Sequence, residues 1–321
     1  MTEALPYRAP WWLPGGHSQT LYAALLLRAP RIDYRRQRRD TPDGDFVDFD
    51  WVDCPREAPL LALFHGLEGD SRSHYALAIM AAARARGWRG VVAHFRGCSG
   101  EPNRLPRAYH SGDAREIGWM LRQLRAEAAG APLYAVGISL GGNALLKWLG
   151  EAGAAAAGTL DAAAAVCAPL DLMAAGNALD SGFNRIAYVA HFLSTLRAKS
   201  LAKLARFPGL YDARAVRAAR TLREFDDLVT APLHGFRDTD DYWTRASSKP
   251  WLKHIRVPTL LINAGNDPFV PARTLPGPRD VSDAVRLEQP AQGGHLGFVG
   301  GPFPGNFDWL PARVLQFLAG A

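Results

Sequence analysis

A single serine stands where a nucleophile would be expected. Ser139 lies in the stretch GISLG, residues 137–141, after an apolar run at 132–136 and before a leucine-rich run at 145–149. A strand followed by a helix would place this serine at a sharp turn, with its hydroxyl projecting over a sheet. Glycines are needed on both sides because strand and helix converge there. The pattern predicts a nucleophile elbow, and its alternative is a glycine-rich turn without chemistry.

A serine hydroxyl is a weak nucleophile that needs a base, and the base needs an acid to orient it. His295 lies in the glycine-rich stretch QGGHLGFVG, which is suited to delivering a side chain. Asp267 ends the apolar stretch TLLINAGND and would face the carboxyl edge of a sheet, where active sites gather. NDPFVP also fits an ordinary Asx turn, and Asp171 is a rival acid. We predict that Ser139, Asp267 and His295 serve as nucleophile, acid and base, the chain order typical of enzymes with this elbow.

Acyl transfer also requires two N–H donors that stabilise the oxyanion. We expect one from the backbone of Leu140, directly after the nucleophile, and the other from Leu67, in the loop that follows LALFHG. His65 and Gly66 would shape that loop, although a plain turn after a strand would look the same. The donors are backbone groups, so the side chain of Leu67 would matter little.

Other reactive side chains lack a pattern that assigns them to catalysis. Cys98 has no base identifiably paired with it, and we interpret it as structural. Arg96 and Gly97 are expected to shape the floor of a pocket. Asp113 follows His110 and precedes a helical pattern that it would cap. The chain carries no His-x-x-x-x-Asp acyltransferase signature, which argues against a transferase.

The elements that must position these residues alternate along the chain. Short apolar strands and longer helical patterns are typical of a mostly parallel sheet with helices on both faces. Strands are expected at 45–52, 59–65, 90–96, 132–136, 161–169, 257–267 and 283–290, and helices at 73–86, 112–128, 145–150 and 306–320.

Residues 171–250 break this rhythm, because they carry helical patterns and no clear buried strand. We predict an inserted helical lid there, between core segments 1–170 and 251–321. One helical pattern, at 183–204, combines basic with apolar side chains. It could rest on anionic lipid or, as we favour, pack on the core like an ordinary amphipathic helix. The side chains concerned are Arg197, Lys199, Lys203 and Arg206 beside Phe192, Leu193 and Leu196.

Composition narrows the class of protein. The 321 residues carry a formal net charge of +6, and the densest basic run is RAPRIDYRRQRR at 28–39. Such a run could meet phosphates, but no nucleic-acid-binding signature accompanies it, and we favour a solvated edge strand. The three cysteines match no metal or redox motif and fit a reducing compartment. With no signal peptide or membrane-length apolar stretch, a cytoplasmic protein is expected, and peripheral membrane contact stays open.

Together, several motifs resemble those of the YheT-like, or EMB8-like, branch of the α/β-hydrolase superfamily. This resemblance spans roughly residues 10–315 and implies an α/β-hydrolase fold and a Ser-Asp-His hydrolase acting on esters. It assigns the three roles to Ser139, Asp267 and His295. Some relatives are phospholipase-like lipid hydrolases. The motifs are WWLPGGHSQTLYAAL, HGLEGDSRSHY, VVAHFRGCSGEPN, AYHSGD, GISLGGNALLKWLGE, NAGNDPFVP and GGHLGF.

The sequence therefore predicts a serine carboxylester hydrolase that works through an acyl-enzyme on a small-molecule or lipid ester. The alternative within the same chemistry is a phospholipase or monoacylglycerol lipase acting at membranes. A non-catalytic binding scaffold is a third hypothesis, disfavoured because no member of the triad is lost. Nothing in the sequence requires a metal ion, an organic cofactor, nucleic acid or an obligate protein partner.

Overall fold

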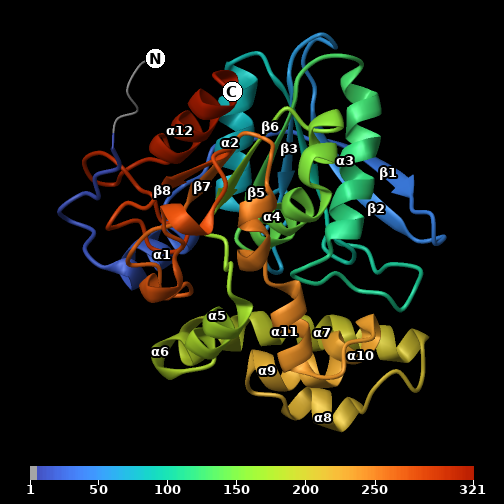
Figure 1. The fold of residues 1–321 in the computed structure, drawn as a ribbon. Helices are drawn as coiled ribbons and strands as arrows, with labels where there is room; N and C mark the ends of the chain where they lie inside the picture. The colour runs from blue at the N-terminus through green and yellow to red at the C-terminus, as the bar shows by residue number, and fades with distance from the viewer. Residues whose placement is uncertain (1–5) are drawn as a thin grey trace.

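The computed structural model describes residues 6–321, which form an eight-stranded sheet with helices around it (Figure 1). The strand order is β1-β2-β4-β3-β5-β6-β7-β8. All strands from β4 to β8 in this order run parallel, whereas β2 is antiparallel to β4 and β1 to β2. The mostly parallel sheet is thus confirmed. The strands are β1 (Arg35–Asp40), β2 (Phe46–Val52), β3 (Leu60–Phe64), β4 (Arg89–Ala93), β5 (Leu133–Ile138), β6 (Ala162–Val166), β7 (Thr259–Ile262) and β8 (Val285–Glu288).

Helices cover both faces of the sheet, as the alternation predicted. Successive side chains of a strand point to opposite faces, so Leu61 and Leu63 pack in one apolar cluster with α2 and α12, whereas Leu60 and Phe64 pack in another with α3 and α4. Burial on both faces explains why the strands read as continuous apolar runs. The covering helices are α2 (His74–Ala85), α12 (Trp309–Ala319), α3 (Ala114–Ala128) and α4 (Leu140–Ala152).

The second half of the arginine-rich run, from Arg35, forms β1 at the edge of the sheet as predicted, whereas residues 28–34 form no strand. Arg36 and Arg38 lie opposite Asp50 and Asp48 of β2, and each guanidinium makes two hydrogen bonds of 2.7–2.9 Å to its carboxylate. Both aspartates are buried. Burial alone would raise the pKa of Asp48, but the hydrogen bond and charge of Arg38 outweigh it and hold that pKa below its usual value. The acidic side chains that alternate along β2 therefore form ion pairs with basic side chains of the neighbouring strand β1.

Between β6 and β7, the described chain forms helical turns and no strand. Figure 1 places these helices together beside one end of the sheet, and they have an apolar cluster of their own that includes Val189, Val216 and Trp243. The helix expected at 183–204 is divided by a π-helical turn at Arg185–Val189. The α-helices are α5 (Leu172–Leu179), α6 (Gly182–Asn184), α7 (Ala190–Arg206), α8 (Ala213–Ala218), α9 (Leu222–Phe225), α10 (Ala231–His234) and α11 (Thr239–Ala246).

One further helix, α1 (Gly16–Leu25), precedes the sheet, and no apolar periodicity predicts it. Its buried side chains are Gln19, Thr20 and Ala23, so the face that it turns inward is largely polar. Hydrophobic periodicity does not predict a helix of this kind, because the method relies on an apolar buried face.

Candidate active site

The backbone at Ser139 has the geometry expected of a nucleophile elbow. Ser139 lies between the end of β5 and the start of α4. Its backbone has φ 51° and ψ −118°, a conformation that residues other than glycine rarely adopt. A Cβ at Gly137 would lie 2.6 Å from the carbonyl oxygen of Gly141, and one at Gly141 would lie 2.4 Å from that of Phe64. The flanking glycines are therefore required by close backbone approach.

The structure brings the other two predicted side chains to this serine. Nε2 of His295 lies 3.0 Å from Oγ of Ser139, and Nδ1 lies 2.8 Å from Oδ2 of Asp267. With the ring proton on Nδ1, the imidazole donates to the carboxylate and leaves Nε2 to accept the serine proton. His295 and Asp267 are both buried, and the ring of Phe269 stacks on the imidazole with centroids 4.1 Å apart. The arrangement suits transfer of the serine proton to Nε2, with the carboxylate holding the imidazole in the required orientation.

Asp267 satisfies both interpretations of its sequence. Its Oδ1 accepts a hydrogen bond from the backbone N–H of Phe269 at 2.8 Å, which is the Asx turn, while Oδ2 faces the imidazole. Asp171, the rival acid, instead caps α5 by accepting from the N–H of Ala174 at 3.0 Å. The turn fixes the direction in which the second oxygen of Asp267 points.

The two residues whose backbone N–H groups were expected to stabilise an oxyanion both line the cavity that contains Ser139. The amides of Leu67 and Leu140 line the same cavity as Ser139 and make no hydrogen bond within residues 6–321. The neighbouring amides are engaged: Gly66 donates to the hydroxyl of Tyr75 at 3.0 Å, and Glu68 donates to that of Tyr109 at 2.9 Å. The amide of Leu67 thus stays available within an otherwise fixed loop, which suits a donor to an oxyanion.

His65 holds that loop to the sheet. Its Nδ1 lies 2.8 Å from the carbonyl oxygen of Gly66, and its Nε2 accepts from the N–H of Phe95 at 3.1 Å. Complete burial lowers the pKa of His65 to about 3, so the ring is neutral and donates from Nδ1. Because the ring is neutral and both nitrogens are hydrogen-bonded, we assign His65 a structural role in fixing the loop.

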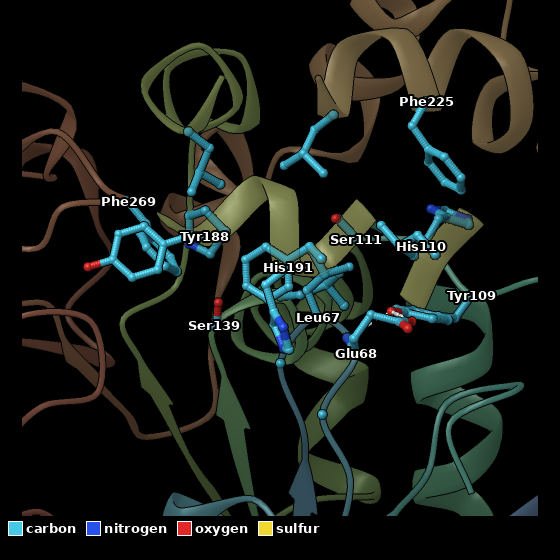
Figure 2. Close-up of a pocket in the computed structure, with 18 of the residues that line it drawn as sticks. Leu67, Glu68, Tyr109, His110, Ser111, Ser139, Tyr188, His191, Phe225 and Phe269 are labelled. Atoms are coloured by element: carbon cyan, nitrogen blue, oxygen red, sulfur yellow. Dashed lines mark hydrogen bonds between the residues drawn. The ribbon is translucent and has the colours of Figure 1, made fainter. Parts of the chain in front are cut away.

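The serine opens into a cavity of about 670 Å³ between the sheet end and the helices that follow β6. Figure 2 shows Ser139 with Tyr188 and Phe269 to one side and Leu67 and Glu68 to the other. Most of the remaining wall is apolar and comes from α1, α5, α7 and α9: Leu21, Ala24, Leu172, Leu179, Phe192, Leu196 and Phe225. Such a cavity fits an extended apolar group beside a reactive hydroxyl.

Some charged groups in the cavity wall are paired. Nζ of Lys199, from α7, lies 2.9 Å from Oε2 of Glu68, next to the loop of Leu67. Burial raises the pKa of the nearby Cys98 thiol to about 12, which keeps it a thiol and supports a structural role. Arg96 lines the cavity, as expected, and its guanidinium bonds to Asp45 at 3.0 Å.

Two of the other basic side chains named above bond to the core, whereas Arg197 donates to the carbonyl oxygens of Leu193 and Arg217 within the inserted helices. Lys203 donates to the carbonyl oxygens of Pro106 and Arg107 at 2.7 and 2.9 Å, and Arg206 donates to that of Asn103 at 2.6 Å. Of the three apolar side chains, Phe192 packs with Phe269 of the core, whereas Leu193 and Leu196 pack with the other helices between β6 and β7. The helix is therefore amphipathic, but only part of its apolar face packs on the core as we favoured. Among residues 6–321, no helix is both long and apolar enough to cross a membrane.

Cys167 lies beside the predicted acid and base. Ligand atoms of Cys167, Asp267 and His295 lie within 4.8 Å of one another. Burial and the adjacent carboxylate raise the pKa of the Cys167 thiol well above its usual value, which disfavours the thiolate that a metal ion would require. Its Sγ instead accepts from the N–H of Leu296 at 3.4 Å. The donor set therefore suits packing better than metal binding.

Comparison with known proteins places this geometry in a family. Residues 59–302 match the family model of the α/β hydrolase fold, and the chain belongs to that family. Within it, the chain is 42% identical over 307 residues to YheT of Escherichia coli (strain K12), a candidate esterase by name, covering 94% of this chain and 89% of YheT. It is 30% identical over 335 residues to the embryogenesis-associated protein EMB8 of Picea glauca, covering 99% and 73%. These matches place the chain in the YheT-like, or EMB8-like, branch of the family.

Two further comparisons agree. The chain is 30% identical over 316 residues to Phospholipase ABHD3 of Mus musculus, covering 96% of this chain and 76% of that protein. The Pyrococcus furiosus esterase Pf2001 superposes with a TM-score of 0.56 over 92% of this chain and 97% of its own, at 16% identity. At that identity the likeness concerns the fold, and it agrees with the expected α/β-hydrolase fold.

Proposed function

We propose that the protein is a serine carboxylester hydrolase with Ser139 as nucleophile, His295 as base and Asp267 as orienting acid. The observation that carries the proposal is the continuous hydrogen-bonded chain from Oγ of Ser139 through both ring nitrogens to the carboxylate, at 3.0 and 2.8 Å. Three residues far apart in the sequence converge there, at a strained turn in the wall of an apolar cavity. A turn without chemistry has no need of that convergence.

In the proposed reaction, Oγ of Ser139 attacks the acyl carbon of the ester while its proton passes to Nε2 of His295. The N–H groups of Leu67 and Leu140 stabilise the resulting oxyanion. The C–O bond to the leaving group then breaks, and the alcohol takes the proton from His295, which leaves an acyl-enzyme. Water attacks this ester and gives a proton to His295. The carboxylic acid departs as Oγ recovers that proton.

The helical residues 171–250 form the proposed lid over core segments 1–170 and 251–321. Support comes from the cavity wall, to which this segment contributes Leu179, Phe192 and Phe225, opposite Ser139 on the core. Substrate entry would then depend on the arrangement of these helices.

A lipid ester is the second candidate substrate. The largely apolar wall suits an acyl chain, and one relative carries the name of a phospholipase. Peripheral membrane contact belongs to this version of the proposal. The unpaired state of all three cysteines supports action in the cytoplasm, which cell fractionation would test.

The first prediction concerns Ser139→Ala, which we expect to abolish turnover of p-nitrophenyl esters and labelling by a fluorophosphonate probe. The change removes only the attacking oxygen, so the thermal midpoint should change little. Esters of increasing chain length and several phospholipid classes should be assayed with this variant as the blank. Equal turnover by purified wild type and variant would refute the proposal, and a wild type that neither reacts with the probe nor turns over any ester would favour the binding scaffold.

A further inference from the structure

We propose that Gln19 and Thr20 of α1 are positioning residues that hold the His295 loop in register with Ser139. The inference rests on the proposed function, since it assigns a task in the same reaction. Both residues lie outside residues 59–302, which match the family model. They are buried in the structure, with 0% and 6% of their surface exposed.

Three consecutive backbone amides of the loop each donate to a side-chain oxygen. Gly293 donates to Oε1 of Gln19 at 2.9 Å, Gly294 to Oδ1 of Asn266 at 2.9 Å, and His295 to Oγ1 of Thr20 at 2.8 Å. The amide of the proposed base is thus anchored to α1. Loop amides that are buried this way need such partners, because no strand supplies them.

Thr20 can accept from His295 because its own proton is directed elsewhere. Oγ1 of Thr20 donates to the carbonyl oxygen of Gly16 at 2.7 Å, one turn earlier in α1. That bond fixes the hydroxyl rotor and turns a lone pair towards the amide of His295. Threonine is therefore used here as an oriented acceptor.

Gln19 uses the whole hydrogen-bonding capacity of its amide. Oε1 accepts from Gly293 at 2.9 Å and from Nδ2 of Asn266 at 3.0 Å, and Nε2 donates to the carbonyl oxygen of Leu13 at 3.0 Å and to Oε1 of Gln292 at 2.8 Å. A side-chain amide has two donors and about two acceptor sites. Gln19 thus ties the loop before His295 to the residue directly before Asp267.

Backbone packing leaves α1 and the loop little freedom to separate by small shifts. A Cβ at Gly16 would lie 2.0 Å from the carbonyl oxygen of Asn266, one at Gly294 would lie 2.6 Å from that of Gly16, and one at Gly297 would lie 2.3 Å from that of Gln19. The loop that carries His295 therefore packs directly on α1. The polar face of α1 supplies side-chain oxygens that accept hydrogen bonds from the loop amides.

The chemical consequence is precision in the position of Nε2. Misplacement of a reacting group by about 1 Å costs on the order of 100-fold in rate. Thr20 also lines the cavity, but most of the cavity wall comes from other residues. We expect Thr20→Val, which keeps the shape and removes the acceptor, to lower kcat roughly 10- to 100-fold with KM changed less than about threefold. Thr20→Ser restores the acceptor and should recover most of kcat.

A matched control separates positioning from stability. Thr259 is a fully buried threonine at the start of β7, whose Oγ1 donates to Val257. Thr259→Val should lower the thermal midpoint without changing kcat. If Thr20→Val does not fold, Gln19→Met supplies the second test. An unchanged kcat in a folded Thr20→Val or Gln19→Met, or a Thr20→Ser as impaired as Thr20→Val, would overturn the inference.

A spectroscopic measurement distinguishes this inference from the proposed function. The Nδ1 proton of His295, bonded to Asp267 at 2.8 Å, should give a downfield proton resonance, assigned by its loss in His295→Ala. We expect Thr20→Val to shift or broaden that resonance and Ser139→Ala to retain it. If the resonance moves in Thr20→Val but Ser139→Ala keeps full turnover, the proposed function fails and the positioning of His295 stands. A resonance unmoved by Thr20→Val refutes the positioning.

Discussion

At the scale of single residues, Asp267 shows how one carboxylate serves two structural demands. Oδ1 closes the turn with Phe269, and that bond aims Oδ2 at the imidazole of His295. The sequence offered turn and acid as alternatives, because a linear pattern cannot separate the two oxygens. It could not rank Asp267 above Asp171 by spacing alone, since only the fold shows that the latter caps α5.

The residue-scale prediction concerns the acid. Asp267→Asn keeps the Asx turn but loses the charge that holds the ring proton on Nδ1, so we expect kcat to fall about 10⁴-fold. Asp171→Asn is the matched control, because asparagine caps a helix as well as aspartate does, and its kcat should equal that of wild type. Steady-state kinetics on a p-nitrophenyl ester measures both. Comparable rates for the two variants would contradict the assigned acid.

At the scale of elements, the sequence predicted what apolar burial dictates. The strands of the sheet were identified because β3 to β7 are buried on both faces. The 257–267 strand was predicted too long: β7 ends at Ile262, and Asp267 lies in the loop beyond. Helix α1 was missed because Gln19 and Thr20 occupy its buried face. The only sequence signal for Gln19 and Thr20 was that they belong to the HSQT stretch of a motif shared with the family. That motif did not indicate a structural role for either residue.

The element-scale prediction concerns the close approach of α4 to the end of β3. In Gly141→Ala the new Cβ would meet the backbone oxygens of Phe64 and His65 at 2.4 and 2.5 Å, so α4 and the end of β3 must separate. We expect a loss of about 1–3 kcal/mol in the free energy of unfolding and a large fall in kcat. Urea unfolding and ester kinetics measure the two effects.

Gly158→Ala is the matched control for that change. A Cβ at Gly158 has no neighbour within 4 Å, so stability should stay within about 1 kcal/mol of wild type and kcat should not change. If Gly141→Ala were as stable and as active as this control, the close approach of α4 to the end of β3 would not be required.

At the scale of the whole molecule, the helices between β6 and β7 form a second packed unit beside the sheet. Their mutual arrangement could not be predicted, because helices as short as α9 and α10, of four residues each, are stabilised by tertiary packing rather than by their own periodicity. The cavity lies between this unit and the core. Its shape, and therefore the substrate, depends on the least predictable part of the chain.

A buried carboxylate gives that unit a predicted pH dependence. Asp226 accepts from Thr230 and from the indole of Trp243 at 2.6 and 2.8 Å, and complete burial raises its pKa to about 7. Between pH 4 and pH 7 the folded protein therefore binds more protons at Asp226 than the unfolded chain does. The contribution of this group to stability is present below its unfolded pKa and is lost as pH rises to the folded value, by at most about 1.4 kcal/mol per pH unit.

Asp226→Asn should remove that decline. We expect the free energy of unfolding to fall less between pH 5 and pH 8 in the variant than in wild type, as measured by urea denaturation at both values. Comparing the two proteins cancels the contribution of other titrating groups. Identical pH dependence in wild type and variant would show that Asp226 does not titrate in this range.

The order of strands has a consequence for where this chain can be divided. Residues 59–302 carry the family match, yet β4 hydrogen-bonds to β2, which lies before residue 59. A polypeptide trimmed to those limits would bare one whole side of β4, and exposed strand edges of this kind recruit other chains. We expect such a fragment to self-associate, because the edge of β4 that β2 covers in the full chain would be exposed.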